Sequence, residues 1–170
     1  MKRFLLPIMG LVFALTFTTA WGQDLSTLNT ALSTPDGSQG SIADIGKDKV
    51  TIVSFWATWC KPCKEEMKAV HAMYDELKEQ GVEYIAVSID NTKTMAKVGP
   101  YINAKGYEFP VLIDPNREIF EVVNGTEVPY TLMYDATGAL RHKHDGYLDG
   151  DEERLKEEAL ELVAEGTTGS

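Results

Sequence analysis

Residues 50–63 read Val50-Thr51-Ile52-Val53-Ser54-Phe55-Trp56-Ala57-Thr58-Trp59-Cys60-Lys61-Pro62-Cys63. The β-branched and aromatic run at the start predicts a buried strand. After the second cysteine, apolar residues recur at helical spacing until Gly81, which predicts a helix; they are Met67, Val70, Met73, Tyr74 and Leu77. Cys60 should therefore lie at a helix N-terminus. Free backbone N–H groups and the helix dipole favour a thiolate there, which is the nucleophilic form of cysteine.

The N-terminal 22 residues have the pattern of an export signal. Lys2 and Arg3 precede an apolar run, and Ala20-Trp21-Gly22 offers a small-x-small cleavage site. Cleavage would leave residues 23–165 as one domain, followed by a tail over 166–170 that we expect to be disordered. The alternative is an uncleaved membrane anchor, but the run is short for a span and is interrupted by Pro7 and Gly10.

The net charge and the cysteine content exclude some classes of function. The formal net charge is −10, and removal of the signal, which carries two basic residues and no acidic ones, makes it −12. Such an acidic domain would repel nucleic-acid phosphates, so we expect no nucleic-acid partner. Cys60 and Cys63 are the two cysteines of the chain. A disulfide between them closes too short a loop to stabilise the fold much, which indicates a chemical role.

The remaining pattern predicts an α/β fold. Expected strands cover 30–33, 39–42, 49–56, 82–89, 110–114, 130–134 and 139–145, and expected helices cover 62–80, 93–105, 116–123 and 151–165. Asp90-Asn91-Thr92 should cap the second helix, and Pro100 should kink or break it. A hairpin, two strand-helix units and a final hairpin followed by a helix indicate a mixed central sheet flanked by helices.

A Cys-x-x-Cys pair has three possible uses. It can exchange disulfides, it can bind a metal together with further ligands, or it can be passive. Candidate ligands are His71, His142 and His144; the last two fall on one face of the final hairpin, where a solvated polar surface is the simpler interpretation. The position between strand and helix favours redox chemistry without a metal or cofactor.

Several neighbours of the pair are candidates for supporting roles. Pro62 fits the first turn of the helix, where a missing N–H costs nothing. Lys61 is either a modest electrostatic aid to the thiolate or an ordinary surface residue. We expect Trp59 to cover the site and Trp56 to lie in the core. At the start of a later strand, Pro129 could form a cis bond that exposes backbone groups to a peptide, but the residues alone favour trans.

The nine residues from Phe55 to Cys63 match the thioredoxin motif Phe-Trp-Ala-x-Trp-Cys-x-Pro-Cys at every fixed position. The chain resembles thioredoxin-fold proteins over residues 31–163. The signal, the segment from 90 to 110 and Phe109-Pro110-Val111-Leu112-Ile113-Asp114 are similar to the exported TlpA/ResA/DsbE-like branch. The resemblance implies a thioredoxin fold with an N-terminal β-hairpin extension and a central insertion.

The resemblance also assigns roles. It implies a cis bond before Pro129, with Val128 and Tyr130 beside it in a peptide-binding groove. Thioredoxin has a buried aspartate at the position of Ser54, which cannot act as a base. ResA-like proteins instead carry a glutamate at the position of Glu66, which implies a proton-relay role; the alternative is one member of a solvated run over residues 64–66.

The function implied is a periplasmic thiol-disulfide oxidoreductase working in the reducing direction. Cys60 would attack a substrate protein disulfide, Cys63 would release it, and a thiol-reducing membrane electron donor would restore the pair. Apocytochrome c is a possible substrate. The alternatives are a disulfide oxidase or isomerase using the same pair and a non-catalytic Cys/His metal carrier. Peroxide reduction is disfavoured because Pro-x-x-x-Thr-x-x-Cys is missing.

Overall fold

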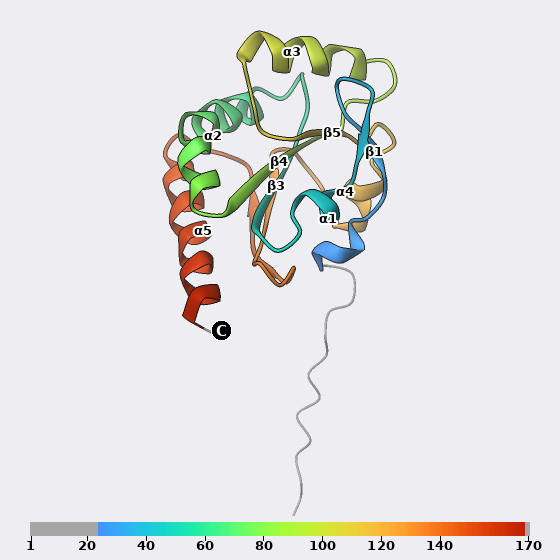
Figure 1. Cartoon of the computed structure of the whole chain (residues 1–170). Helices are drawn as coiled ribbons and strands as arrows, with labels where there is room; N and C mark the ends of the chain where they lie inside the picture. The colour runs from blue at the N-terminus through green and yellow to red at the C-terminus, as the bar shows by residue number, and fades with distance from the viewer. Residues whose placement is uncertain (1–23, 169–170) are drawn as a thin grey trace, which may run out of the picture.

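A computed structural model describes residues 24–168 (Figure 1). The expected signal segment, 1–22, lies outside the described residues. The elements are β1 (Leu32–Ser33), β2 (Gln39–Gly40), α1 (Ile42–Ile45), β3 (Val50–Trp56), α2 (Lys61–Glu79), β4 (Val82–Ser88), α3 (Val98–Lys105), β5 (Val111–Ile113), α4 (Glu118–Val122), β6 (Tyr130–Tyr134), β7 (Leu140–Asp145) and α5 (Asp151–Thr168). Two 3₁₀ turns, η1 (Leu25–Thr27) and η2 (Met95–Lys97), complete the order. The predicted strand-helix sequence is confirmed.

The strands form one mixed sheet in the order β2-β1-β5-β4-β3-β6-β7. β3, β4 and β5 are parallel, whereas β6 pairs antiparallel with β3 and β7 with β6. β1 and β2 form the predicted N-terminal hairpin and join the sheet through β5. The carboxyl ends of β3 and β4 thus lie at the same edge as the start of β6, the place where ligand sites form in such sheets.

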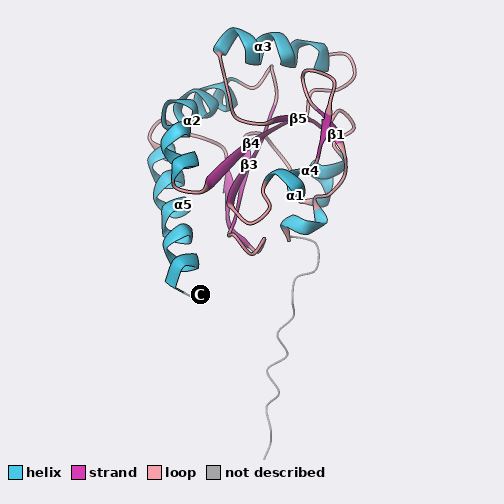
Figure 2. Cartoon of the chain, in the orientation of Figure 1, coloured by secondary structure: helices cyan, strands magenta, loops and turns pink. Residues whose placement is uncertain are grey.

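Helices cover both faces of this sheet (Figure 2). α2 and α5 contact each other and cover the face to which Ser54 and Tyr84 point. On the other face, the Phe55 ring packs on Phe120 of α4, with ring centroids 5.3 Å apart. Every residue of β3 and β4 is buried, because helices shield both sides of the two strands. Trp56 lies in the core, as predicted.

Two predicted boundaries are wrong. The segment 93–105 forms η2 and α3 rather than one helix, and Pro100 falls in the first turn of α3, where its missing N–H leaves no bond unmade. At the C-terminus, α5 continues to Thr168, so residues 166–168 of the expected disordered tail are helical. Between residues 24 and 168, no helix combines the length and apolar content needed to cross a membrane.

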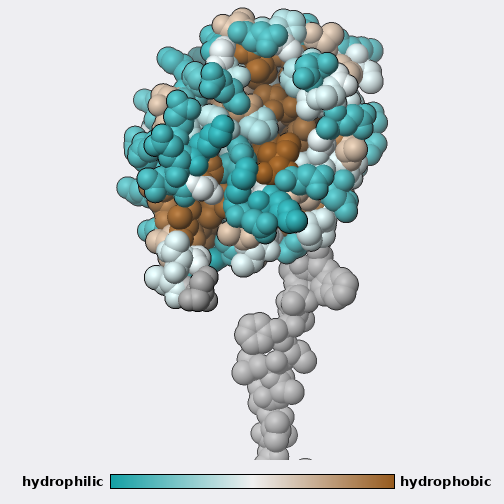
Figure 3. Space-filling view, in the orientation of Figure 1, coloured by the Kyte–Doolittle hydropathy of each residue, from teal (hydrophilic) through white to brown (hydrophobic). Residues whose placement is uncertain are grey.

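The face seen in Figure 3 is mostly hydrophilic, with hydrophobic side chains visible below α3. A hollow of about 300 Å³ lies between α3, β5 and the β1–β2 turn. Its apolar lining includes Ile45, Ile102, Phe109 and Leu112. None of its lining residues belongs to the cysteine-containing segment, so this hollow is separate from the redox pair.

Candidate active site

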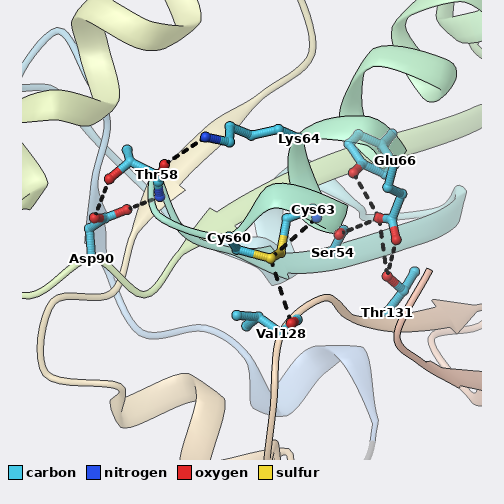
Figure 4. Close-up of a disulfide and its surroundings, with 10 residues drawn as sticks. Ser54, Thr58, Cys60, Cys63, Lys64, Glu66, Asp90, Val128 and Thr131 are labelled. Carbon is cyan, nitrogen blue, oxygen red and sulfur yellow. Dashed lines mark hydrogen bonds between the residues drawn. A yellow bond between two sulfur atoms is a disulfide. The ribbon is translucent and has the colours of Figure 1, made fainter. Parts of the chain in front are cut away.

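Cys60 and Cys63 form a disulfide at the start of α2 (Figure 4). Cys60 is the N-cap of the helix, and its Sγ accepts a hydrogen bond from the N–H of Cys63 over 3.2 Å. Pro62 occupies the first turn, as predicted. Cys60 is 5% exposed and Cys63 only 1%, so an incoming disulfide reaches Cys60 more readily. The helix N-terminus favours the thiolate of the reduced pair.

The segment before β6 lies next to Cys60, because the start of β6 pairs with the carboxyl end of β3. The Val128–Pro129 peptide bond is cis, as the resemblance implies. The carbonyl oxygen of Val128 lies 3.6 Å from the Sγ of Cys60. When the pair is reduced, that oxygen can accept a hydrogen bond from the Cys60 thiol. Val128 is therefore positioned beside the sulfur of the more exposed of the two cysteines.

A shallow groove of about 280 Å³ borders this contact. Trp59, 59% exposed, and Val128 line it together with Ile89, Arg117, Phe120, Thr126 and Glu127. Among the described residues, no acceptor binds the backbone N–H groups of Thr126, Glu127 or Val128. A peptide can thus pair with this backbone as an added strand. Trp59 forms a wall of the groove next to Val128.

Tyr130 has a different place from the one predicted. Its side chain is 1% exposed, and its hydroxyl donates to the carbonyl oxygen of Val123 over 2.8 Å. Its ring packs against Phe55 and Phe120. A substrate cannot touch this side chain, so the expected role of Tyr130 in substrate binding is wrong for its side chain. The ring instead belongs to the aromatic core beside β3 and α4.

Asp90 holds the loop before the nucleophile, a role that the sequence analysis missed. Its carboxylate accepts hydrogen bonds from the N–H and the hydroxyl of Thr58, both over 2.7 Å, and from the Ser88 hydroxyl over 2.9 Å. Burial alone raises the pKa of Asp90, but the bonds from Thr58 and Ser88 outweigh it and hold the pKa below its ordinary value. Asp90 is thus an ionised, buried clamp and not a helix cap.

Glu66 is buried on the sheet side of α2, with only 2% exposure. Its Oε1 accepts hydrogen bonds from the hydroxyls of Ser54 over 2.6 Å, Tyr84 over 3.2 Å and Thr131 over 3.3 Å. Burial raises the pKa of Glu66 above its ordinary value of 4.5, while the three hydroxyls act in the opposite direction. The alternative of a solvated Glu66 is wrong. The helical spacing of Cys63, Glu66 and Val70 already places them on one face.

A family model described as the AhpC/TSA family matches residues 24–143. The matched region contains the cysteine pair, Glu66 and the segment before β6. This chain belongs to the AhpC/TSA family.

Individual relatives of this AhpC/TSA-family protein agree with the fold. The thiol-disulfide oxidoreductase ResA of Bacillus thuringiensis (strain Al Hakam) is 35% identical over 103 residues, which span 61% of this chain and 58% of ResA. A thioredoxin-like protein from Porphyromonas gingivalis is 33% identical, with a TM-score of 0.72 and coverage of 85% and 95% of the two chains. A putative thiol:disulfide interchange protein DsbE from Chlorobium tepidum has a TM-score of 0.74 at 23% identity, over 84% and 96%. The predicted thioredoxin fold and the resemblance to ResA and DsbE are confirmed.

The remaining candidates in the AhpC/TSA-family protein have other partners. Lys61 is exposed and lies 3.6 Å from the Glu65 carboxylate. His142 and His144 share a face, as predicted, and the face is only partly solvated: the Nε2 of His144 lies 2.6 Å from Glu158 of α5, whereas the His142 side chain is 34% exposed. Within residues 24–168, no three His, Cys, Asp or Glu side chains are placed to hold a metal ion.

We expect Glu66→Gln to change how stability depends on pH. Below about pH 4.5 Glu66 is protonated in both the folded and the unfolded chain. Above that pH, Glu66 ionises first in the unfolded chain. The free energy of unfolding of the parent protein therefore falls with rising pH until the pKa of Glu66 in the folded chain is passed. The variant lacks this loss, and its free energy of unfolding relative to the parent should rise with pH. Urea unfolding at a series of pH values measures the difference.

The matched control for this experiment is Glu65→Gln, which removes the same charge from the exposed neighbour. Glutamine also alters the hydrogen bonds with the three hydroxyls, but that offset does not depend on pH. A constant difference between Glu66→Gln and the parent across the range, or one that grows as the pH falls, would contradict a raised pKa for Glu66.

Proposed function

We propose that this protein is an exported thiol-disulfide oxidoreductase that reduces disulfides in substrate proteins. The observation that carries the proposal is the Cys60–Cys63 disulfide at the N-terminus of α2, with the Val128 carbonyl oxygen 3.6 Å from the Sγ of Cys60. The Sγ of Cys60 lies beside Val128, which lines the groove, and Cys63 is the less exposed of the two cysteines, at 1% against 5%. The similarity to ResA supports the same assignment.

The reaction begins from the reduced pair. The Cys60 thiolate attacks one sulfur of the substrate disulfide, whose S–S bond breaks and releases a substrate thiolate. Cys63, buried beside Cys60, then attacks the Sγ of Cys60 and releases the second substrate thiolate. Two electrons pass from the pair to the substrate, each released thiolate takes up a proton, and the Cys60–Cys63 disulfide of the structure is the product.

In the second step, Glu66 controls the protonation state of the Cys63 thiol. It lies one helical turn from Cys63, and burial holds its pKa above the ordinary value. A carboxyl group of this kind can take the proton of the Cys63 thiol as Cys63 becomes a nucleophile. Ser54 occupies the neighbouring strand position but contributes a hydrogen bond to Glu66 and no base.

The partners follow from this direction of transfer. A thiol-reducing electron donor in the membrane must restore the pair, since an exported protein meets an oxidising compartment such as the periplasm. Apocytochrome c, whose haem-binding cysteines must be reduced, is the candidate substrate implied by the resemblance. Val128 and Pro129 would hold its backbone in the groove next to Cys60.

A Cys63→Ser variant tests the exchange chemistry. Without the second thiol, the mixed disulfide between Cys60 and a substrate has no internal route to resolution, so it should accumulate. The variant is incubated with a disulfide-containing model protein, and adducts are detected by mass spectrometry under non-reducing conditions. Adducts should disappear on addition of dithiothreitol. The absence of any adduct through Cys60 would refute the proposed mechanism.

The direction of transfer is tested by equilibrating the pair with glutathione and measuring its reduction potential. We expect a value nearer the roughly −270 mV of thioredoxin than the roughly −120 mV of the oxidant DsbA. About 30 mV corresponds to about 1.4 kcal/mol for a two-electron couple, so the two directions are well separated. A value near about −120 mV would assign the pair to disulfide donation.

A further inference from the structure

A second hollow, of about 300 Å³, adjoins the cysteine pair on the side of α3. Its walls come from the first turns of α2, from α3 and from the residues after α3; they are Lys61, Lys64, Glu65, Lys68, Tyr101, Lys105 and Tyr107. Figure 4 shows Lys64 and Val128 on different sides of the disulfide. We name this feature the lysine hollow. It shares no residue with the groove beside Val128.

The charge of the lysine hollow is opposite to that of the whole protein. Four lysines and one glutamate line it, whereas the chain carries a formal net charge of −10. Glu65 lies 3.6 Å from Lys61, but Lys68 and Lys105 form no ion pair with any residue between 24 and 168. A local excess of one sign in a concave surface attracts groups of the other sign.

The wall of the lysine hollow also contains a tyrosine with a buried hydroxyl. Tyr107 is 8% exposed, and its hydroxyl has no hydrogen-bond partner among the described residues. The hydroxyl of Tyr101 is near enough to lower the pKa of Tyr107 in part, against the larger effect of burial, yet the two do not meet hydrogen-bond geometry. Because the hydroxyl itself has almost no accessible surface, a group that enters the hollow meets the Tyr107 ring and not its hydroxyl.

Lys64 gives the hollow a fixed edge next to the nucleophile. Its Nζ donates to the carbonyl oxygen of Thr58 over 3.1 Å and lies 5.9 Å from the centre of the Tyr101 ring. Thr58 is two residues before Cys60 in the loop that Asp90 clamps. A group bound among these lysines would therefore be held at a defined place relative to the sulfur of Cys60.

We infer that the lysine hollow binds a carboxylate-bearing segment of the protein whose disulfide reacts at Cys60. The inference rests on the proposed exchange reaction and adds a property of the partner: aspartate or glutamate residues close to its reactive cysteine. Charge complementarity of this kind selects partners and speeds encounter more than it tightens a complex. The backbone groove beside Val128 holds the peptide, and the lysine hollow selects its sequence.

Binding is tested first, without exchange chemistry. Two synthetic peptides carry a serine in place of the reactive cysteine, followed in one by three glutamates and in the other by three glutamines. Fluorescence titration of the oxidised protein at low salt should give about tenfold tighter binding of the glutamate peptide. Lys68→Glu combined with Lys105→Glu should reduce that ratio to about one. These lysines are chosen because Lys61 and Lys64 touch the reacting loop.

The matched control is Lys47→Glu combined with Lys78→Glu, which changes the charge equally at the far ends of β3 and α2. It should keep most of the preference for the glutamate peptide. Equal binding of both peptides to the parent protein, or equal loss of the preference in both double variants, would overturn the inference.

The same peptides with a cysteine, held as a mixed disulfide with pyridine-2-thiol, then report exchange with the reduced protein. The inference predicts a rate constant about tenfold higher for the glutamate peptide, with the ratio falling as salt screens the charges. If the glutamate peptide binds preferentially but neither peptide reacts, carboxylate binding in the lysine hollow is supported and the proposed oxidoreductase function is contradicted. If both peptides react at equal rates and bind equally, the oxidoreductase function is supported and carboxylate binding in the lysine hollow is contradicted.

Discussion

The Cys60→Ser variant is expected to lose disulfide exchange by at least about a thousandfold. A serine hydroxyl ionises far less readily than a thiol and cannot form the mixed disulfide, so the first chemical step has no nucleophile. The remaining Cys63 is 1% exposed and cannot replace it. The measurement is the rate at which the protein, with dithiothreitol as terminal reductant, reduces the disulfides of a model substrate protein.

Cys63→Ser is the informative comparison for this experiment. Both variants lose the disulfide, so any effect of the crosslink on stability is common to them. Cys63→Ser should retain the first attack and lose turnover, whereas Cys60→Ser should lose both. Retention of more than about a tenth of the parental rate by Cys60→Ser would show that Cys63 is the attacking residue and that the assigned roles are reversed.

The Asp90→Ala variant is expected to lose about 3 kcal/mol of its free energy of unfolding. Its carboxylate binds the N–H and the hydroxyl of Thr58 and the hydroxyl of Ser88, and alanine leaves these donors without a buried acceptor. Since the folded pKa of Asp90 lies below its ordinary value of 3.8, the difference from the parent is full above that pH. It should shrink as the pH falls through the folded pKa.

Two further variants separate the clamp from general effects of charge. Asp149→Ala removes an exposed carboxylate and should change the free energy of unfolding by less than about 0.5 kcal/mol. Asp90→Asn keeps one acceptor oxygen and should fall between the parent and Asp90→Ala. Equal stability of Asp90→Ala and Asp149→Ala in urea unfolding at neutral pH would show that the Thr58 bonds contribute little.

The strand and helix around the cysteine pair could be predicted because each has a clean periodic pattern. β3 is a continuous apolar run, and α2 repeats its apolar residues at helical spacing, with Gly81 after its end. The position of Cys60 at the helix N-terminus followed from those two patterns alone. The cis bond before Pro129 did not, since the residues favoured trans and only the family motif indicated otherwise.

Contacts between distant segments could not be predicted from the chain. Asp90 has the sequence context of a helix cap, but Thr58, 32 residues earlier, supplies better donors for its carboxylate. Tyr130 was expected in the groove because it follows Pro129, and strand pairing turned its ring into the core instead. The helical spacing from Cys63 indicates a buried position for Glu66. The charged neighbours Lys64 and Glu65 fit a solvated run equally well, so the sequence alone could not decide between the two.

The same long separations order events while the chain is being made. Cys60 and its contact Val128 are 68 residues apart, and Glu66 and Thr131 are 65 apart. During synthesis from the N-terminus, both thiols emerge well before the segment that forms their groove. For that interval the nascent chain carries a pair of thiols with no groove to choose their partners and no hydroxyl from β6 beside Glu66. Selectivity is the last property of this site to be completed.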